Sequence, residues 1–422
     1  MPGDKSISHR AGMIAALARG TSRIRNFSTS EDCAATLRCL EQLGVSIARQ
    51  SNDVTVEGAG MRGLSAPKEP LDCGNSGTTM RLLAGILAGQ NFEATLTGDE
   101  SLRSRPMQRI IEPLEMMGAE ILSNHGRPPL TIRGRNSLTP LDYELLVASA
   151  QVKSAILLAG LTANGETKVV EHTPTRDHTE RMLREFGVAI EQGGAPKEGH
   201  TFGSVKGPAS FSARDVEVPG DTSSAAYFVA AAALLDGSSL EIENVGLNPS
   251  RVEFLDVGKS AGLNVNFEVQ REHGNEPVGV VRVAGARRTH ESTDAPLTID
   301  GNRIAALIDE LPLLAVIGSQ LVGGIEIRKA GELRVKESDR IAATVAGLRA
   351  MGAEIEEFDD GLRVGGPMRL RGARIDSRGD HRIAMTFAVA GLLAEGDTEI
   401  TGADCVSVSF PEFFDLLGSV VE

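Results

Sequence analysis

Several short segments combine Lys or Arg with Gly, Ser and Thr, the residue types that commonly bind anions. Each precedes an Ala- and Leu-rich stretch that reads as a buried helix, and their sequences are PGDKSISHR (2–10), DCGNSGTTMR (72–81), VASAQVKSA (147–155), VPGDTSSAA (218–226), IDELP (308–312) and RGDHRIAM (378–385). A helix start attracts anions through its free N–H groups and its dipole. Ser, Thr, Asn and Asp are also ordinary N-caps. Because the segments also carry basic residues, we expect several of these starts to bind the phosphates or carboxylates of a small substrate, with the cations Lys5, Arg10, Arg81, Lys153 and Arg382.

A second group of charged segments precedes the helices that have polar faces. Its members are GDESLRSRP with Arg103 and Arg105, HTPTRDHTE with Arg176 and Asp177, and GELRVKESDR with Arg334, Lys336, Glu337, Asp339 and Arg340. Arginine pairs its planar fork with carboxylates and phosphates, and adjacent Lys and Glu can exchange protons. Taken alone, the last segment is more typical of a solvent-exposed, salt-bridged turn. Its equivalence to the other two segments favours ligand contact.

Two further sites hold titratable side chains. Asp309 and Glu310 begin a buried helix, with Pro312 in its first turn. One of the two acids can be a helix cap and the other a base, and the sequence leaves open which. His381 is either a titratable partner or a capping group, whereas His9 is expected to be packed in the core.

The composition narrows the class of function. The 422 residues include 43 Lys and Arg against 57 Asp and Glu, a net charge of −14, whereas nucleic-acid-binding proteins are usually basic. The absence of Trp argues against a stacking platform for single strands. Four cysteines without CxxC spacing disfavour a zinc site or a disulfide framework. P-loop, GxGxxG, GxSxG and HExxH motifs are missing, and no apolar stretch reaches the ~20 residues of a membrane span.

The elements that position these residues recur six times along the chain. One phrase, a polar-faced helix closed by Gly and followed by a strand, has its glycines at Gly44, Gly118, Gly187, Gly262, Gly352 and Gly418. A second phrase, an apolar helix followed by Gly and a strand, has its glycines at Gly20, Gly89, Gly165, Gly237, Gly324 and Gly396. Glycine after a helix is typical of the left-handed cap position. We therefore predict an α/β protein of six similar units, three per domain, divided near residues 210–218, with a cleft and hinge motion between the domains.

The motifs together resemble those of a known enzyme family. The chain is similar to the 3-phosphoshikimate 1-carboxyvinyltransferases, or 5-enolpyruvylshikimate-3-phosphate synthases, in GDKSISHR (3–10), GNSGTTMRLL (74–83), RPM (105–107), SAQVKSA (149–155), TRDHTERML (175–183), PGDTSSAA (219–226), DELPLLA (309–315), LRVKESDR (333–340) and GDHRIAM (379–385). The resemblance implies a two-domain inverted α/β barrel built from six repeated βαβαββ-like units, with an interdomain cleft. It places residues 8–214 in one domain and residues 1–7 with 215–422 in the other.

The resemblance also implies a reaction and its site. The family transfers the enolpyruvyl group of phosphoenolpyruvate to the 5-hydroxyl of shikimate 3-phosphate and releases phosphate, on the pathway to chorismate and aromatic amino acids. The expected contacts to shikimate 3-phosphate are Lys5, Ser6, Arg10, Ser149, Ala150, Gln151, Arg176, Asp309 and Lys336. Those to phosphoenolpyruvate are Lys5, Gly77, Arg105, Gln151, Arg340 and Arg382, and the expected catalytic residues are Asp309, Glu337, Lys5 and His381. No metal, cofactor, nucleic acid or membrane is implied, and the expected state is a cytoplasmic monomer.

The chemistry of the two substrates accounts for these residue types. Phosphoenolpyruvate carries a phosphate and a carboxylate and needs several cations. We expect Asp309 to be the base for the 5-hydroxyl, and Glu337 with Lys5 to transfer the proton at the methylene carbon. Within this resemblance, Gly77 rather than alanine predicts sensitivity to glyphosate, a phosphonate that occupies the phosphoenolpyruvate site.

Two alternatives remain at this stage. One is the UDP-N-acetylglucosamine enolpyruvyl transferase, which shares the fold but differs in its opening motif and usually has a cysteine on a mobile loop. The other is a catalytically inactive binding module of the same fold. The presence of Lys5, Asp309, Glu337 and Arg382 argues against the second alternative.

Overall fold

A computed structural model describes residues 1–195, 200–285 and 295–421, and the chain forms two compact units. We call Pro2–Pro219 with Glu272–Glu276 the N-terminal unit, and Met1, Gly220–Arg271 and Pro277–Glu422 the C-terminal unit. The sequence-based division placed residues 1–7 and 215–219 with the C-terminal half. Here residues 2–7 and 215–219 group with the N-terminal unit, because Lys5 already begins a helix that is buried there.

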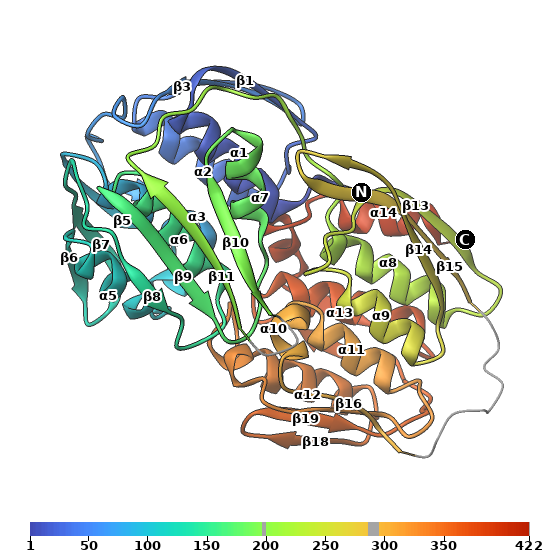
Figure 1. The fold of residues 1–422 in the computed structure, drawn as a ribbon. Coiled ribbons are helices and arrows are strands. Elements are labelled where there is room, and N and C mark those ends of the chain that lie inside the picture. Colours follow the sequence, from blue (N-terminus) through green and yellow to red (C-terminus); the bar gives the residue numbers. More distant parts are fainter. Residues whose placement is uncertain (196–199, 286–294, 422) are drawn as a thin grey trace. The chain divides into compact units, whose positions relative to one another are not determined.

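The N-terminal unit contains three four-stranded sheets, among the residues described (Figure 1). Each has one parallel pair at an edge and antiparallel pairs elsewhere. In sheet order the strands are β12 (Val216–Glu217), β1 (Arg19–Arg25), β3 (Asp53–Ala59) and β2 (Ser46–Gln50); β4 (Leu71–Asp72), β5 (Glu93–Thr97), β7 (Arg127–Arg133) and β6 (Glu120–Asn124); and β10 (Ile190–Ala195), β11 (His200–Gly207), β9 (Gly165–Glu171) and β8 (Asp142–Glu144).

The helices of this unit follow the predicted division into buried and polar-faced sets. The buried helices are α1 (Lys5–Leu17), α3 (Gly77–Ala88) and α6 (Ala150–Gly160), and α3 packs against both of the others. The remaining helices are α2 (Glu31–Gln42), α4 (Glu100–Ser104), α5 (Gln108–Met116) and α7 (His178–Glu185). A helix that is apolar on all sides must be buried, and the three apolar helices therefore form the centre of this unit's own hydrophobic core.

The C-terminal unit has a separate hydrophobic core and the same kind of elements. Its buried helices are α8 (Thr222–Leu234), α11 (Leu311–Gly318) and α13 (His381–Leu392), and α13 packs against α8, α11 and α12 (Arg340–Ala350). Its sheets are β13 (Ser239–Gly246), β15 (Glu276–Ala284) and β14 (Asn264–His273); β16 (Leu297–Ile299), β17 (Ile325–Ile327), β19 (Gly361–Val364) and β18 (Ile355–Phe358); and β20 (Arg374–Asp376) with β21 (Glu399–Thr401). The other helices are α9 (Glu253–Ser260), α10 (Arg303–Leu307), α14 (Phe413–Val420) and the 3-10 turns η2 (Gly331–Val335) and η3 (Ala403–Val408). None of the helices described here has the length and apolar character needed to cross a membrane.

The left-handed glycine caps predicted from the first phrase are confirmed at five of its six positions. Gly44, Gly118, Gly187, Gly262 and Gly352 each directly follow the C-cap residue of a helix and have positive φ angles. The prediction is wrong at Gly418, which lies inside α14. The glycines of the second phrase are placed differently: Gly89 is the C-cap residue of α3 with φ −90°, and Gly20 and Gly165 lie in the strands β1 and β9.

One segment from the second half of the sequence belongs to the N-terminal unit. It is Glu272–Glu276, which comprises the end of β14, the turn and the first residue of β15. The Nδ1 atom of the buried His178 lies 2.7 Å from the Glu276 Oε1 atom, and Arg181 Nη1 donates to the carbonyl of Asn275 at 2.5 Å. These contacts hold the turn against α7.

Candidate active site

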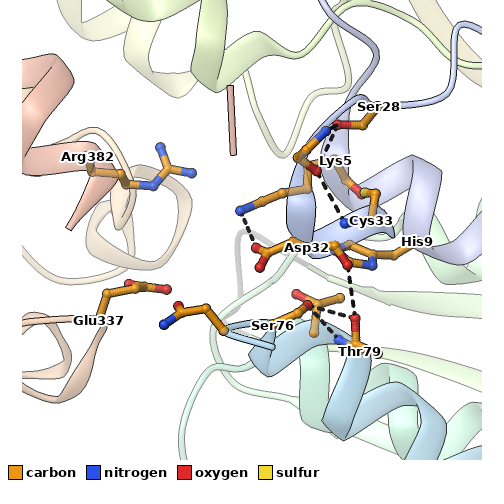
Figure 2. Close-up of polar contacts among 12 residues, drawn as sticks. Lys5, His9, Ser28, Asp32, Cys33, Ser76, Thr79, Glu337 and Arg382 are labelled. Carbon is orange, nitrogen blue, oxygen red and sulfur yellow. Dashed lines mark hydrogen bonds and ion pairs between the residues drawn. The ribbon is translucent and has the colours of Figure 1, made fainter. Parts of the chain in front are cut away.

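Lys5 is oriented by a carboxylate on the neighbouring helix. Asp4 caps α1 by accepting a hydrogen bond from the Ile7 amide at 2.9 Å, and Lys5 stands in the first turn. Its Nζ atom lies 2.9 Å from Asp32 Oδ2 on α2, and only 19% of the lysine side chain is exposed (Figure 2). The ammonium group is therefore held in one position at the start of α1.

Arg10 is one of the least exposed cations of the N-terminal unit. Its Nε atom donates to Thr179 Oγ1 at 2.7 Å, and its Nη atoms donate to the Ser6 carbonyl at 2.8 Å and to Ser154 Oγ at 2.9 Å. Burial lowers the pKa of Arg10 to about 10, although the Glu180 and Asp4 carboxylates act to raise it. The hydrogen bonds of Arg10 hold the first turn of α1, with Ser6, against α6 and α7.

The start of α3 brings Gly77 and Arg105 together. Ser76 caps this helix by accepting from the Thr79 amide at 3.0 Å. Arg105 Nη2 donates to Asn75 Oδ1 at 2.6 Å and to Ser101 Oγ at 3.1 Å. A Cβ atom at Gly77 would lie 2.5 Å from Arg81 Nη1 and 3.4 Å from Arg105 Nη1, so both guanidinium groups lie close to the start of the helix.

Three of the expected shikimate contacts lie at the start of α6. Ser149 is the N-cap, Ala150 is the first helical residue, and Gln151 follows. The Gln151 Oε1 atom accepts from Arg81 Nη1 at 2.8 Å, and its Nε2 atom donates to Thr78 Oγ1 at 2.8 Å. Gln151 thus connects the starts of α6 and α3. Arg176 lies in the half-buried segment that precedes α7.

The prediction that Lys153 binds an anionic ligand is wrong. Its Nζ atom lies 2.8 Å from both Glu171 Oε2 and Glu180 Oε1, and all three side chains are almost completely buried. Burial alone would lower the pKa of Lys153, but the two carboxylates raise it above its ordinary value. Its charge is therefore neutralised inside the core of the N-terminal unit.

In the C-terminal unit, three carboxylates surround the buried Arg340. Its Nε atom donates to Asp380 Oδ2 at 2.8 Å, its Nη2 atom donates to Glu337 Oε2 at 2.5 Å, and its Nη1 atom lies 3.5 Å from Asp309 Oδ1. Burial acts to lower the pKa of Arg340, but Asp380 and Glu337 raise it above its ordinary value. Arg340 therefore stays charged and holds Glu337 and Asp309 beside it.

Arg382 is the second arginine of this cluster. Its Nε atom lies 3.4 Å from Asp309 Oδ1, and its Nη1 atom donates to the Asp309 carbonyl at 3.4 Å. Burial acts to lower the pKa of Arg382, whereas Asp309 and neighbouring groups raise it. Tyr227 is buried near these charges, and burial raises the pKa of its hydroxyl to about 12, so the phenol stays neutral.

Asp309 and Glu310 are neighbours in the sequence but have different partners in the structure. The Glu310 Oε1 atom accepts a hydrogen bond from the Ser223 hydroxyl, and Arg251 Nη2 donates to the same hydroxyl at 2.8 Å. Glu310 is also the N-cap residue of α11, without a side-chain capping bond. Asp309 faces Arg340 and Arg382 instead. Asp309 is therefore the one of the two acids that lies beside the arginines of this cluster.

The remaining predicted residues lie on both sides of Arg340. Lys336 ends the turn η2 and is half-buried. His381 is buried in the first turn of α13, after Asp380, whose side chain accepts from the Arg382 amide at 2.9 Å. The cap is therefore Asp380 and not His381. Arg334 forms ion pairs with Asp339 at 2.7 Å and Glu357 at 3.1 Å, which fits the salt-bridged turn that its segment also suggested.

The predicted residues thus form two sets. Lys5, Ser6, Arg10, Gly77, Arg105, Ser149, Ala150, Gln151 and Arg176 belong to the N-terminal unit, and Asp309, Lys336, Glu337, Arg340, His381 and Arg382 belong to the C-terminal unit. The first set offers cations and helix starts for anions. The second offers two carboxylates held by arginines, which suits proton transfer beside an anionic group. Within the described part of the chain, no group of three or more His, Cys, Asp or Glu side chains is arranged to hold a metal ion.

Sequence reasoning missed the partners that orient these side chains. Asp32 pairs with Lys5, Asn75 with Arg105 and Asp380 with Arg340. Asn75 and Asp380 stand inside the quoted motifs and so could have been proposed. Asp32 stands in an ordinary amphipathic stretch and carries no such signal.

Comparison with known proteins agrees with this chemistry. A family model described as EPSP synthase (3-phosphoshikimate 1-carboxyvinyltransferase) matches residues 1–417. Proteins named 3-phosphoshikimate 1-carboxyvinyltransferase from Koribacter versatilis and Salinibacter ruber are 54% and 48% identical, each over 100% of this chain and 96% of their own length. The EPSP synthase structure from Acinetobacter baumannii, described at 2.37 Å, matches with a TM-score of 0.85 and 41% identity, over 99% of this chain and 94% of that one.

Proposed function

Because the chain belongs to the EPSP synthase (3-phosphoshikimate 1-carboxyvinyltransferase) family, we propose that the two residue sets carry out enolpyruvyl transfer together. The protein is an enolpyruvyl transferase of the shikimate pathway. Its substrates are phosphoenolpyruvate and shikimate 3-phosphate, and phosphate is released. Its fold is a mixed α/β fold with many sheets that matches solved EPSP synthases. As a finer proposal, it is an inverted α/β barrel of six βαβαββ-like units, three per domain, with the substrates bound in a cleft between the domains.

The observation that carries the proposal is the position of Asp309 and Glu337 beside Arg340. The arginines attract the phosphate and carboxylate of phosphoenolpyruvate, while the two carboxylates supply and remove protons. Lys5, Gly77, Arg105 and Gln151 complete the phosphoenolpyruvate contacts in this proposal. Ser6, Arg10, Ser149, Ala150, Arg176 and Lys336 contribute contacts to shikimate 3-phosphate.

The proposed reaction has two stages. A proton, carried by Glu337 with Lys5, adds to the methylene carbon of phosphoenolpyruvate. At the same time Asp309 takes the proton of the 5-hydroxyl, and the hydroxyl oxygen bonds to the carbon of phosphoenolpyruvate that lies next to the methylene carbon. In the second stage the carbon–oxygen bond to phosphate breaks, phosphate leaves with the electron pair of that bond, and the new methyl group returns a proton to Glu337 with Lys5, which restores the carbon–carbon double bond. Exclusion of water during these steps protects the intermediate from hydrolysis. The role of His381 is to assist proton transfer from the start of α13.

A phosphate-release assay with each acceptor tests the proposal. We expect phosphate release from phosphoenolpyruvate with shikimate 3-phosphate and none with UDP-N-acetylglucosamine. Turnover with the nucleotide sugar would support the alternative transferase, although the family model and the relatives above favour the shikimate enzyme. Tight binding of shikimate 3-phosphate without turnover would indicate an inactive binding module. The same proposal includes a monomeric state, a cytoplasmic location and sensitivity to glyphosate. Gel filtration tests the monomeric state, and inhibition assays test the sensitivity to glyphosate.

A further inference from the structure

A chain of hydrogen-bonded, buried polar side chains connects three helices in the N-terminal unit. His9 Nδ1 lies 2.7 Å from Thr36 Oγ1, Thr36 Oγ1 lies 2.7 Å from Thr79 Oγ1, and Thr79 Oγ1 lies 2.8 Å from Ser76 Oγ (Figure 2). Each of these side chains belongs to a residue with at most 1% exposure. The chain begins on α1, crosses α2 and ends at the N-cap of α3.

The number of protons on these side chains determines which group donates in each of the hydrogen bonds. The Thr79 hydroxyl has one proton, which it donates to Ser76 Oγ, with the Asp32 carbonyl also 3.4 Å away. The short Thr36–Thr79 contact then requires Thr36 to be the donor. The single proton of Thr36 is thereby used, and His9 Nδ1 must donate to Thr36.

The environment of His9 supports the same assignment. Within the described residues, His9 Nε2 is buried without a hydrogen-bond partner. A proton on Nε2 would leave a buried donor unsatisfied and would also remove the donor that Thr36 requires. Burial, with the charges of Lys5 and Arg10, holds the pKa of His9 well below its ordinary value. His9 is therefore neutral, with its proton on Nδ1.

The His9–Thr36 hydrogen bond lies one helical turn further along α1 and α2 than the Lys5–Asp32 pair. His9 follows Lys5 by four residues on α1, and Thr36 follows Asp32 by four residues on α2. Residues four apart lie on the same helix face. The two helices are therefore joined twice on facing sides, by the ion pair and by the His9–Thr36 hydrogen bond. Thr79 extends the connection to Ser76, the residue before Gly77.

We propose that His9, Thr36 and Thr79 are positioning residues that hold Lys5 and the start of α3 in the arrangement that binds phosphoenolpyruvate. This inference rests on the proposed function, in which Lys5 and Gly77 contact that substrate. The three residues touch no substrate, and they act through the relative placement of α1, α2 and α3. Their loss should weaken phosphoenolpyruvate binding more than it weakens turnover or shikimate 3-phosphate binding.

Matched substitutions test the direction and the role of the chain. Thr36→Val keeps the side-chain shape but removes the hydroxyl, and it should raise KM for phosphoenolpyruvate about three- to tenfold, as expected for one lost buried hydrogen bond. Thr36→Ser keeps the hydroxyl and should stay close to the wild type. The side-chain amide of His9→Asn can occupy the place of Nδ1 and should retain most of the affinity. His9→Gln places its amide at Nε2 and should not.

Nitrogen NMR of the isotope-labelled wild type provides a readout that does not depend on activity. We expect a protonated Nδ1 and an unprotonated Nε2 for His9. A proton on Nε2 would overturn the direction of the chain whether or not any variant folds. Equal KM changes in Thr36→Ser and Thr36→Val, or no change in Thr36→Val, would contradict the positioning role, because the hydroxyl group of Thr36 would then contribute nothing to phosphoenolpyruvate binding. Absence of turnover in the wild type would instead contradict the proposed function and leave the NMR result to decide the tautomer.

Discussion

The Nε atom of Arg340 lies 2.8 Å from Asp380 Oδ2, with 1% or less of either side chain exposed. Asp380 also accepts from the Arg382 amide at 2.9 Å and from the Ser338 hydroxyl at 3.0 Å. One carboxylate thus neutralises the buried arginine, caps α13 and ties the segment before α12 to it. Asp380 therefore contributes to the placement of both Arg340 and Arg382, together with Glu337 and Asp309.

Asp380→Asn should destabilise the protein by about 3 kcal/mol, because breaking a buried ion pair leaves Arg340 with less compensation for its charge. Urea denaturation followed by circular dichroism measures the change. Asp376→Asn is the matched control, since Asp376 is exposed and its carboxylate accepts a hydrogen bond from the nearby Arg378 amide. It should lose less than about 1 kcal/mol. Equal losses in the two variants would contradict a special role for the buried pair.

Asp309→Asn and Glu337→Gln should each lower turnover about 100- to 10,000-fold, because each removes a group assigned to proton transfer. Phosphate release at saturating substrates measures the effect, and circular dichroism checks that each variant folds. Glu356→Gln, at an exposed position on β18, serves as the control and should keep normal turnover. Near-normal turnover in both folded test variants would show that the assignment is wrong.

Gly77→Ala should raise KM for phosphoenolpyruvate about tenfold, since the new Cβ atom would lie 2.5 Å from Arg81 Nη1 and 3.4 Å from Arg105 Nη1. The guanidinium group of Arg81 must then move, and its hydrogen bond to Gln151 weakens. Steady-state kinetics with varied phosphoenolpyruvate gives the comparison. Gly331→Ala meets no atom within 4 Å and should leave KM unchanged. An unchanged KM in Gly77→Ala would mean that Arg81 and Arg105 move aside without cost to binding.

The pH dependence of stability should change in His9→Asn. The pKa of His9 is well below the value of 6.5 expected in the unfolded chain, so below pH 6.5 the unfolded state binds a proton that the folded state does not. This residue therefore makes the wild type lose up to about 1.4 kcal/mol of stability per pH unit as the pH falls below 6.5. His9→Asn removes that contribution, and the free energies of unfolding of the two proteins should converge or cross on acidification. Parallel curves would indicate that His9 has the same pKa in the folded and unfolded states and would contradict its buried, neutral form.

The sequence indicates local features better than distant partners. Glycine after an amphipathic helix predicts a left-handed cap because the preference depends on a few residues, as Gly44 and Gly352 show. Gly418 has the same local pattern but lies inside α14, where the helix continues past it. Tertiary packing decided this case, and the local sequence does not contain that information.

At the candidate active site, too, the sequence indicates the charged residues but not their distant partners. Motifs identify Lys5, Arg340 and Arg382 as cations for ligands, yet Lys153 has a similar setting and is neutralised by Glu171 and Glu180. Asp309 and Glu310 are neighbours whose different partners come from distant segments. The sequence therefore predicts which segments carry the chemistry. It cannot distinguish a charged residue that binds a ligand from one that is neutralised by buried partners in the core, because that distinction depends on contacts between residues far apart in the chain.

The contact between Glu276 and His178 has a practical consequence for dissecting the protein. A gene divided after Pro219 would encode an N-terminal fragment that lacks Glu272–Glu276 and leaves His178 without its carboxylate partner. Such a fragment should be less soluble when expressed alone, and co-expression with the remainder should rescue it. Truncation at the apparent boundary therefore does not isolate an intact half, and a fusion of the β14–β15 turn to the fragment is the better starting point for separate study.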